Sequence, residues 1–580
     1  MTTNVLYIKR YGLSRRINMN KNWILAALCS TSLVAACGNN ETEVASETVE
    51  EVVSVAMDGP AFDLISTPVG NVNFPSSCNA VAAPLVERGV ALMHNMMYTE
   101  AQFVFSMADD ADPKCAMSYW GQAMAQIHPL WGDTLNAEDF ARGLELTKRG
   151  QAIEGLTDRE RNFLKTSEAF YTVDEDMSMR GGFERISASL AEVSAEMPND
   201  MDAKAFNALF KVAISGNDPE RLEAGQLALD VLKTMPNHPG GHHYVIHAFD
   251  TATLAEGALE TADHYGEITP KVPHASHMMT HTYTRLGKWD SAIEWNNISA
   301  GSALELCIEN GAVNSHYPHA MDYLVFAHLQ KGDDAAAAKL EEELFSLDIQ
   351  EYEASGQRGI AYAFTAVPAR NSLERKDWEM AITLTPKAPA YFPWIDADRR
   401  DIGNTYFARA MGFSMLGRPD EAEEEIKLLS EMAETLPPMN GLAYYKMKID
   451  SQLLGARAWQ SFARGDAENA LALMKQASEQ EASSENAPSN PGDILPSEEM
   501  LGDMYLELAR LEEAHEAYKL SLARSPGRYN SIYGAGNTAY ELGDMMTAKK
   551  YFSQLVENAA GGNSQRASLD DARTKLASIN

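Results

Sequence analysis

Residues 500–559 read MLGDMYLELARLEEAHEAYKLSLARSPGRYNSIYGAGNTAYELGDMMTAKKYFSQLVENA, and one pattern occurs twice within them. Three positions recur after a step of 34 residues, as Gly502 and Gly536, Ala514 and Ala548, and Tyr518 and Phe552. Pro526 closes the first copy, where a proline would end a helix. A fixed period of this length is typical of stacked pairs of antiparallel helices.

A second pattern indicates the turns between helices. In five places a glycine precedes an alanine by five residues, namely Gly287 and Ala292, Gly332 and Ala337, Gly417 and Ala422, Gly465 and Ala470, and Gly543 and Ala548. A glycine readily adopts the left-handed conformation that ends a helix, and the alanine then begins the next helix. A related spacing occupies Gly89, Ala101, Phe105, Ala108 and Pro113.

These spacings resemble the tetratricopeptide repeat (TPR). The resemblance implies an all-α fold, a TPR-like helical-hairpin superhelix (α-solenoid) with a concave groove. Counted from the family's first position, hairpins are expected near Ala82, Ala116, Ala205, Pro239, Pro273, Pro318, Tyr362, Gly403, Ser451, Leu495 and Tyr529. No segment alternates apolar and polar residues over the length of a strand, so we expect no sheet.

Further segments are similar to a group of bacterial TPR lipoproteins and secreted proteins. They are MHNMMY at 93–98, AMSYWG at 116–121, HPLW at 128–131, HYVIH at 243–247 and PHASH at 273–277. This resemblance implies the same architecture and leaves the chemistry open.

The N-terminal residues resemble a bacterial lipoprotein signal. Basic residues precede an apolar stretch, 23–36, that is too short for a bilayer span and leads directly to Cys37. The resemblance implies cleavage before Cys37, a lipid on its thiol, and an outer-membrane anchor with the protein facing the periplasm, because Gly38 replaces the aspartate of the inner-membrane retention signal. The alternative is a signal-like helix in a cytosolic chain.

Composition divides the rest of the chain. The predicted parts are a signal peptide 1–36, an acidic flexible tether 37–77, N-terminal hairpins with a helical insertion 78–204, a central histidine-rich region 205–360, hairpins 361–478, a loop 479–497 and a C-terminal pair 498–580. Within the insertion, Thr157 and Glu160 match a helix capping box. The net charge of −34 argues against a nucleic-acid partner and leaves the lipid anchor as the predicted contact with a membrane.

Three cysteines remain beyond the signal and the lipid site. Cys78 precedes the first hairpin and Cys115 precedes the second, so we expect a disulfide between them and a reduced Cys307. Two separate buried thiols at Cys78 and Cys115 are the alternative, because sequence does not give the distance that a bridge requires.

Eleven of the fourteen histidines lie between His238 and His328. Two pairs, His243 with His247 and His277 with His281, have the i, i+4 spacing that places both rings on one helical face. Neutral imidazoles so arranged can bind zinc, nickel or copper, with Asp250 in support. Packed helices lie about 8–10 Å apart, so one ion can bridge two neighbouring first helices.

The same face permits another interpretation. His274, His319 and Asp322 are candidates for binding a ligand in the groove, and the whole surface could be polar lining for a peptide. His242, His264, His316 and His328 fall off this face, and His94 and His128 are expected at the edge of the core. The preferred function is a cell-envelope lipoprotein that binds a peptide or protein in its groove. The alternative is a metal-binding or metal-dependent hydrolytic protein, and no local enzyme signature identifies a catalytic residue.

Overall fold

The computed structural model describes residues 62–131, 135–172, 178–347, 349, 351–352, 357–436, 442–483 and 490–579. The predicted signal peptide, Cys37 and the first part of the tether lie outside these residues. In the described ranges every regular element is a helix, apart from an isolated bridge between Val313 and Tyr352. None of these described helices combines the length and the apolarity that a bilayer crossing requires.

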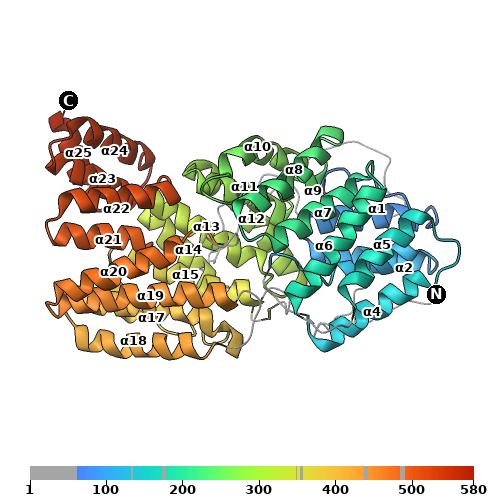
Figure 1. The fold of residues 1–580 in the computed structure, drawn as a ribbon, viewed down its shortest axis with the longest axis horizontal. Coiled ribbons are helices and arrows are strands. Elements are labelled where there is room, and N and C mark those ends of the chain that lie inside the picture. The colour runs from blue at the N-terminus through green and yellow to red at the C-terminus, as the bar shows by residue number, and fades with distance from the viewer. Residues whose placement is uncertain are drawn as a thin grey trace, which may run out of the picture. The chain divides into compact units, whose positions relative to one another are not determined.

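The helices follow one another along the chain (Figure 1). The N-terminal ones are α1 (Ala82–His94), α2 (Tyr98–Ala111), α3 (Ala116–Met124), α4 (Ala137–Gln151), α5 (Asp158–Phe170) and α6 (Met179–Glu196). The central ones are α7 (Met201–Ile214), α8 (Asp218–Thr234), α9 (Pro239–Ala248), the short η1 (Ala255–Ala258), α10 (Leu259–Ile268), α11 (Pro273–Arg285), α12 (Trp289–Asn310), α13 (His316–Gln330) and α14 (Asp334–Phe345).

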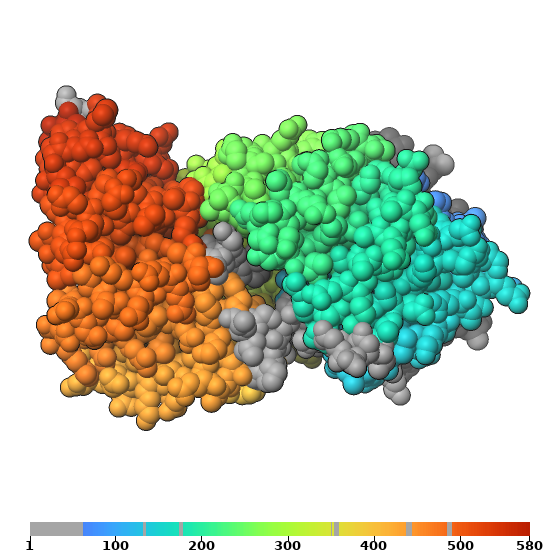
Figure 2. Space-filling model, in the orientation of Figure 1, coloured from blue at the N-terminus to red at the C-terminus, as the bar shows by residue number. Residues whose placement is uncertain are grey.

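The C-terminal half continues in the same manner. Its helices are α15 (Gln357–Leu373), α16 (Trp378–Thr383), the short η2 (Asp396–Asp398), α17 (Arg399–Met415), α18 (Pro419–Glu434), α19 (Leu442–Ala463), α20 (Ala467–Ala482), α21 (Ser497–Glu507), α22 (Leu511–Arg524), α23 (Tyr529–Glu541), α24 (Met545–Asn558) and α25 (Ala567–Ile579). Figure 2 shows successive segments following one another across this face of the molecule, from blue to red.

The packing order is that of stacked hairpins. From α7 onward each helix contacts the next, and the first helices α7, α9, α11, α13, α15, α17, α19, α21 and α23 also contact one another in sequence. This confirms the predicted all-α, TPR-like α-solenoid. The expected hairpin starts at Ala82, Ala116, Pro239, Pro273 and Tyr529 coincide with the first residues of helices.

The turn glycines behave as predicted. Gly287, Gly332, Gly417, Gly465 and Gly543 all have positive φ, between 66° and 82°. Each follows the first helix of a hairpin, where a residue with a side chain would be strained. The capping box is also confirmed, because Thr157 accepts the backbone N–H of Glu160 while the Glu160 carboxylate accepts that of Thr157.

The later part of the predicted tether, residues 62–77, packs on the hairpins. The ring of Phe74 lies 5.1 Å from that of Trp120 and 4.8 Å from that of Phe163. Ser77 donates from its backbone N–H to Glu160 at 2.8 Å. The acidic stretch that suggested a tether, 41–51, comes before this segment, and residues 62–77 belong to the folded body.

The predicted disulfide joins Cys78 to Cys115, and Cys307 is a buried free thiol. The bridge connects the start of the N-terminal hairpins to the residue that precedes α3. Because the two cysteines are separated by 37 residues, the bridge also restricts the unfolded chain.

Of the predicted loop 479–497, the structure describes residues 479–483 and 490–497. Residues 479–482 complete α20, and residues 490–493 contact α11 and α15. Arg285 donates to the carbonyls of Asn490 and Pro491, and Arg370 donates to those of Gly492 and Asp493. The carbonyls of these non-helical residues are therefore paired with arginine side chains. The segment covers part of the face that was predicted to be an open groove.

Candidate metal centre

The central first helices begin at proline residues, which suits the first helical position because that N–H needs no partner. Pro239 opens α9 after the side chain of His238 caps it by accepting the N–H of Gly241 at 3.2 Å. Pro273 opens α11. Since α9, α11 and α13 contact one another in order, residues on their facing sides meet.

Seven histidine rings from these three helices form one continuous group, which we call the histidine cluster. Each ring centroid lies within 5.8 Å of at least one other. Its members are His243 and His247 on α9, His274, His277 and His281 on α11, and His316 and His319 on α13. The two predicted i, i+4 pairs therefore do share one region of the fold.

The cluster is interior rather than an open surface. His243, His247, His274, His277 and His281 are buried, and His316 and His319 are partly exposed. Burial lowers the pKa of His243 and His319 to about 3 and that of His316 to about 4. These rings are therefore neutral at neutral pH, which is the form that ligates a metal ion.

Within the cluster, the ligand atoms gather into two groups of three. His277, His281 and His319 form one, and His243, His247 and His274 form the other; in each, the three ring nitrogens lie within 4.8 Å of one another. The sequence grouped His243, His247, His277 and His281 around one ion. The structure instead completes each pair with a histidine from the next first helix.

The pair on α11 has a specific geometry. Nε2 of His277 lies 2.9 Å from Nε2 of His281. On the other side of each ring, Nδ1 of His277 is 2.8 Å from Oδ1 of Asn296, and Nδ1 of His281 is 2.8 Å from Oδ2 of Asp250. Both rings are thus held from behind and directed at each other.

Asp250 lies beside the histidine cluster, as the sequence predicted. It orients a histidine ring there and is not itself among the grouped ligand atoms. Its carboxylate bonds His281 and also pairs with the guanidinium of Arg285 at 2.8 Å. Burial alone would raise the pKa of Asp250, yet the charge of Arg285 and the contact with His281 hold it below the usual value. The carboxylate is therefore ionised and available as a hydrogen-bond acceptor.

Two predicted groove residues have other roles. Asp322 forms a buried ion pair with Arg370 at 2.8 Å, and Arg370 also binds the loop at 492–493. This corrects its prediction as a groove ligand, because its charge is already neutralised inside the protein. His274 is 7% exposed and belongs to the cluster rather than to an open groove wall.

His316 was assigned off the histidine face and in fact belongs to the cluster. Its ring lies 5.3 Å from that of His274 and 5.5 Å from that of Trp131. The reason is that α13 begins at His316, two residues before the expected hairpin start at Pro318. His316 and His319 are then three residues apart on one helical face.

A third group, His94, Asp202 and His238, has similar ligand distances but complete hydrogen bonding. Nε2 of His238 and Nε2 of His94 lie 3.2 and 3.3 Å from Oδ1 of Asp202. Nδ1 of His94 is 2.9 Å from the hydroxyl of Tyr244, and Nδ1 of His238 caps α9. Every ring nitrogen therefore has a protein partner, and this group is explained without a metal.

The other histidines off the predicted face have local partners. His264 contacts Glu267, His328 contacts Asp333, and His242 reaches the carbonyl of Pro236 at 2.7 Å. His128 lies in the aromatic group with Tyr98 and Trp131, as the edge-of-core prediction implied.

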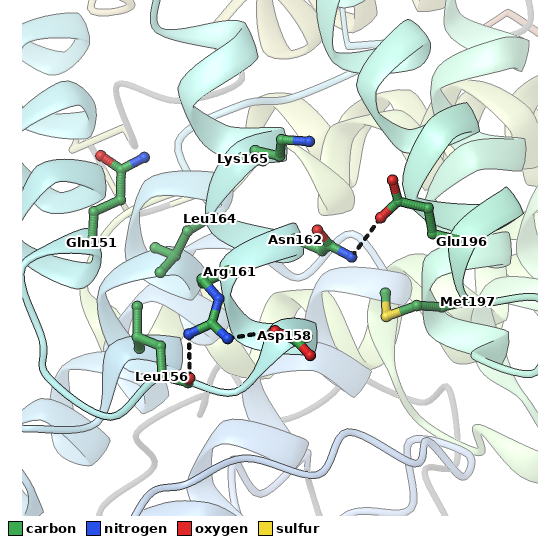
Figure 3. Close-up of a pocket in the computed structure, with 9 residues that line it drawn as sticks. All are labelled: Gln151, Leu156, Asp158, Arg161, Asn162, Leu164, Lys165, Glu196 and Met197. Carbon is green, nitrogen blue, oxygen red and sulfur yellow. Dashed lines mark hydrogen bonds and ion pairs between the residues drawn. The ribbon is translucent and has the colours of Figure 1, made fainter.

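Two surface hollows lie away from the histidine cluster. Figure 3 shows the larger, about 700 Å³ in volume, beside α5 and α6. Among its polar side chains, Arg161 bonds Asp158 and Asn162 donates to Glu196 at 3.1 Å. The second, about 570 Å³, is lined mainly by acidic residues of α10. Neither includes a residue of the cluster.

Comparison with known proteins gave limited results. No protein-family model and no curated protein matches the chain. Among solved structures, the Cut9-Hcn1 hetero-tetramer of the APC/C has 13% identity over 86% of this chain and 90% of that chain, with a TM-score of 0.28. PilF of Pseudomonas aeruginosa has 15% identity over 38% of this chain and 90% of that one, with a TM-score of 0.22. Similarities at these values carry no functional conclusion for this chain.

Proposed function

We propose that this protein binds a transition metal ion at His277, His281 and His319. The observation that carries the proposal is the 2.9 Å separation of the Nε2 atoms of His277 and His281, together with what lies behind each ring. The site deepens the sequence prediction by adding His319 as the third ligand.

The hydrogen bonds behind the rings assign the protons. The side-chain amide of Asn296 donates to the carbonyl of Ala292 at 3.0 Å, so its oxygen is left to accept from Nδ1–H of His277. The ionised carboxylate of Asp250 accepts from Nδ1–H of His281. With Nδ1 donating in each ring, the form of the pair that can ligate a metal carries a lone pair on each Nε2, and the two Nε2 atoms face each other.

Two facing lone pairs at this distance repel unless a cation lies between them. Zinc–nitrogen bonds of roughly 2.0–2.1 Å would place an ion beside both atoms with an N–metal–N angle of about 90°. A carboxylate or carbonyl behind a ligating imidazole is the usual way in which its orientation and basicity are set. A shared proton is the competing occupant of the same gap.

The donor set indicates the class of metal. Three neutral imidazoles suit zinc, copper, nickel or iron better than calcium or magnesium, which prefer oxygen. Hydrolysis would require a substrate to reach an open coordination position. We propose metal binding and assign no reaction.

We also propose where in the cell this protein acts. The lipoprotein-like signal supports a lipid anchor at Cys37 in the cell envelope, and the Cys78–Cys115 bridge is in keeping with an oxidising compartment. A peptide or protein partner stays a prediction, and it would need a surface other than the first-helix faces covered by residues 490–496.

The test uses the full chain without a histidine tag, stripped with EDTA and reloaded with Zn²⁺, and in parallel samples with Ni²⁺ or Cu²⁺. We expect bound zinc that resists gel filtration, and we expect the His277→Gln/His281→Gln variant to lose one equivalent by elemental analysis. His264→Gln is the matched control, because that ring is surface-exposed and outside the cluster. Circular dichroism checks that each variant folds.

Two outcomes would overturn the proposal. One is a wild-type protein that binds no zinc, nickel or copper above background, which would leave the shared proton as the occupant. The other is a folded double variant that retains all of the wild-type metal.

A further inference from the structure

We propose that the repeat duplicates this centre, and that His243, His247 and His274 form a second transition-metal site one hairpin earlier. The inference rests on the proposed function of the first site, which we call the α11–α13 centre. The second is called the α9–α11 centre.

The two centres have the same construction in sequence. His243 and His247 are each followed by a histidine 34 residues later, His277 and His281. The third ligand of each centre comes from the next hairpin, where it directly follows a proline, in Pro273-His274 and in Pro318-His319. The step is 34 residues for the two paired ligands and 45 for the third, because the 22-residue α12 lengthens the intervening hairpin, so the same order of ligands recurs one hairpin later.

The structure brings the second set together as it does the first. Two ligands lie on α9 and one on α11, and their ring nitrogens lie within 4.8 Å of one another. The ring centroids of His243 and His247 are 4.9 Å apart, and those of His243 and His274 are 5.2 Å apart. A tetrahedral zinc ion needs nitrogens about 3.4 Å apart, so a small inward shift of the rings would complete the centre.

Four of the six ring nitrogens in this second set lack a partner among the described residues. Nδ1 of His243 donates to the carbonyl of His94 at 2.6 Å, which leaves its Nε2 with a lone pair and no partner. Nε2 of His274 and both ring nitrogens of His247 are also buried without a partner. A buried ring nitrogen without a partner destabilises the fold, and one ion would satisfy three such nitrogens at once.

The contrast with His94, Asp202 and His238 makes this observation specific. That group is equally buried and equally close, yet its nitrogens are bonded to Asp202, Tyr244 and Gly241. Burial of histidines in this fold is thus compatible with full hydrogen bonding. His242 also has an unsatisfied buried nitrogen, Nδ1, but at the α9–α11 centre unsatisfied rings from three positions place their ligand atoms within 4.8 Å of one another, and that convergence points to a ligand.

The surroundings predict that the second centre is the weaker one. His247 has no carboxylate behind it, whereas Asp250 supports His281 in the α11–α13 centre. The guanidinium of Arg221 donates to the carbonyl of His247 at 3.2 Å and brings a positive charge near the site. Loss of an orienting partner typically lowers metal affinity 10- to 100-fold, so we expect the two sites to fill in sequence.

The experiment is a Zn²⁺ titration of the EDTA-stripped full chain, read by calorimetry and by native mass spectrometry. Wild-type protein should bind two ions, the second at least about tenfold more weakly than the first. The His243→Gln/His247→Gln variant should bind one ion with the tighter affinity, and His277→Gln/His281→Gln one ion with the weaker affinity. Combining all four substitutions should abolish binding.

His242→Gln is the matched control. It lies next to His243 on α9 and is similarly buried, but its ring bonds the carbonyl of Pro236 rather than the cluster. This variant should still bind two ions. If it lost one, the effect of the neighbouring substitutions would be structural, and the assignment of the second centre would fail.

The outcomes separate this inference from the proposed function. A single ion that is lost in either double variant would mean one shared centre, which overturns the duplication and leaves metal binding intact. A single ion lost only with His277 and His281 would show that the α9–α11 centre is empty. No ion in the wild-type protein would overturn the proposed function itself.

Discussion

At the scale of single residues, the histidine groups have similar distances between their ligand atoms but differ in the hydrogen-bond partners of their ring nitrogens. His238 and His94 both donate to Asp202, so their other nitrogens are free to accept from Gly241 and Tyr244. Nδ1–H of His243 donates to the carbonyl of His94, which leaves a buried lone pair on Nε2 without a partner. The same side chain is therefore structural in one place and a candidate ligand in another.

The Asp202 group predicts how the metal-free protein responds to acid. Burial lowers the pKa of His94 from 6.5 to about 4. Between these values the unfolded chain binds a proton that the folded protein does not, so stability rises with pH in this window. His94 alone should reduce the free energy of unfolding by about 2 kcal/mol between pH 7.5 and pH 5.

Urea denaturation in EDTA at pH 7.5, 6 and 5 measures this dependence. The His94→Gln variant should be less stable at neutral pH but should lose less stability on acidification, because its side chain does not titrate. An identical pH dependence in the variant and the wild-type protein would show that His94 is not held neutral by the fold.

Residue-level prediction from sequence succeeded where one helix supplies both partners. The i, i+4 rule placed His243 beside His247 and His277 beside His281, and the rings are indeed 4.9 and 4.8 Å apart. Asn296 could not be predicted as a partner of His277, because it comes from α12 and depends on how the two helices of the hairpin pack. The ion pair between Asp322 and Arg370 could not be predicted either, because Arg370 belongs to the next hairpin.

At the scale of elements, the turn glycines decide how closely neighbouring parts of the chain approach. Gly287 has a φ of +66°, and an added Cβ would lie 2.7 Å from the carbonyl oxygen of Pro526. Gly465 occupies the same position in another hairpin, with a φ of +82° and open space around it. The two sites share a backbone conformation and differ in their surroundings.

Replacing each of these glycines by alanine should therefore have unequal effects. Gly465→Ala should cost roughly 1–2 kcal/mol, the penalty for a left-handed residue with a side chain. Gly287→Ala adds an overlap with a backbone atom, which typically costs a further 1–3 kcal/mol. Thermal and urea denaturation of both variants measure the difference, and equal losses would mean that the approach to Pro526 is not tight in solution.

Element boundaries were predictable where a proline or a glycine marks them and less so elsewhere. The repeat spacing located the turns and several helix starts, because these depend on local backbone conformation. Composition alone suggested a tether through residue 77 and a loop at 479–497. Helix α20 extends to Ala482, into the predicted loop, while residues 490–496 are non-helical. The contacts of Phe74 and of the carbonyls at 490–493 with distant hairpins could not be predicted, because no local pattern reveals them.

At the scale of the whole molecule, buried arginines fasten the C-terminal hairpins to the central ones. Arg528, at the start of α23, pairs with Glu374 and with Glu499, both at 2.9 Å, and all three side chains are fully buried. Arg285 and Arg370 hold residues 490–493 in the same region. Arg285 also pairs with Asp250, so this junction is in direct contact with the group that orients His281.

We predict that Arg528→Met loosens this junction. The substitution keeps an apolar stem but leaves Glu374 and Glu499 buried without a cation, and loss of one member of such a set typically costs about 3–5 kcal/mol. Thermal denaturation should register the loss, and hydrogen exchange should increase in α23–α25. Arg573→Met is the control, because its ion pair with Asp570 is exposed and worth at most about 1 kcal/mol.

A second variant separates the charge effect from packing. In Arg528→Met/Glu374→Gln/Glu499→Gln no uncompensated carboxylate remains, so we expect part of the lost stability to return. If the single and triple variants were equally unstable, the guanidinium would act through its shape and hydrogen bonds rather than through its charge. If Arg528→Met matched the exposed control, the C-terminal hairpins would not depend on this ion pair for their attachment.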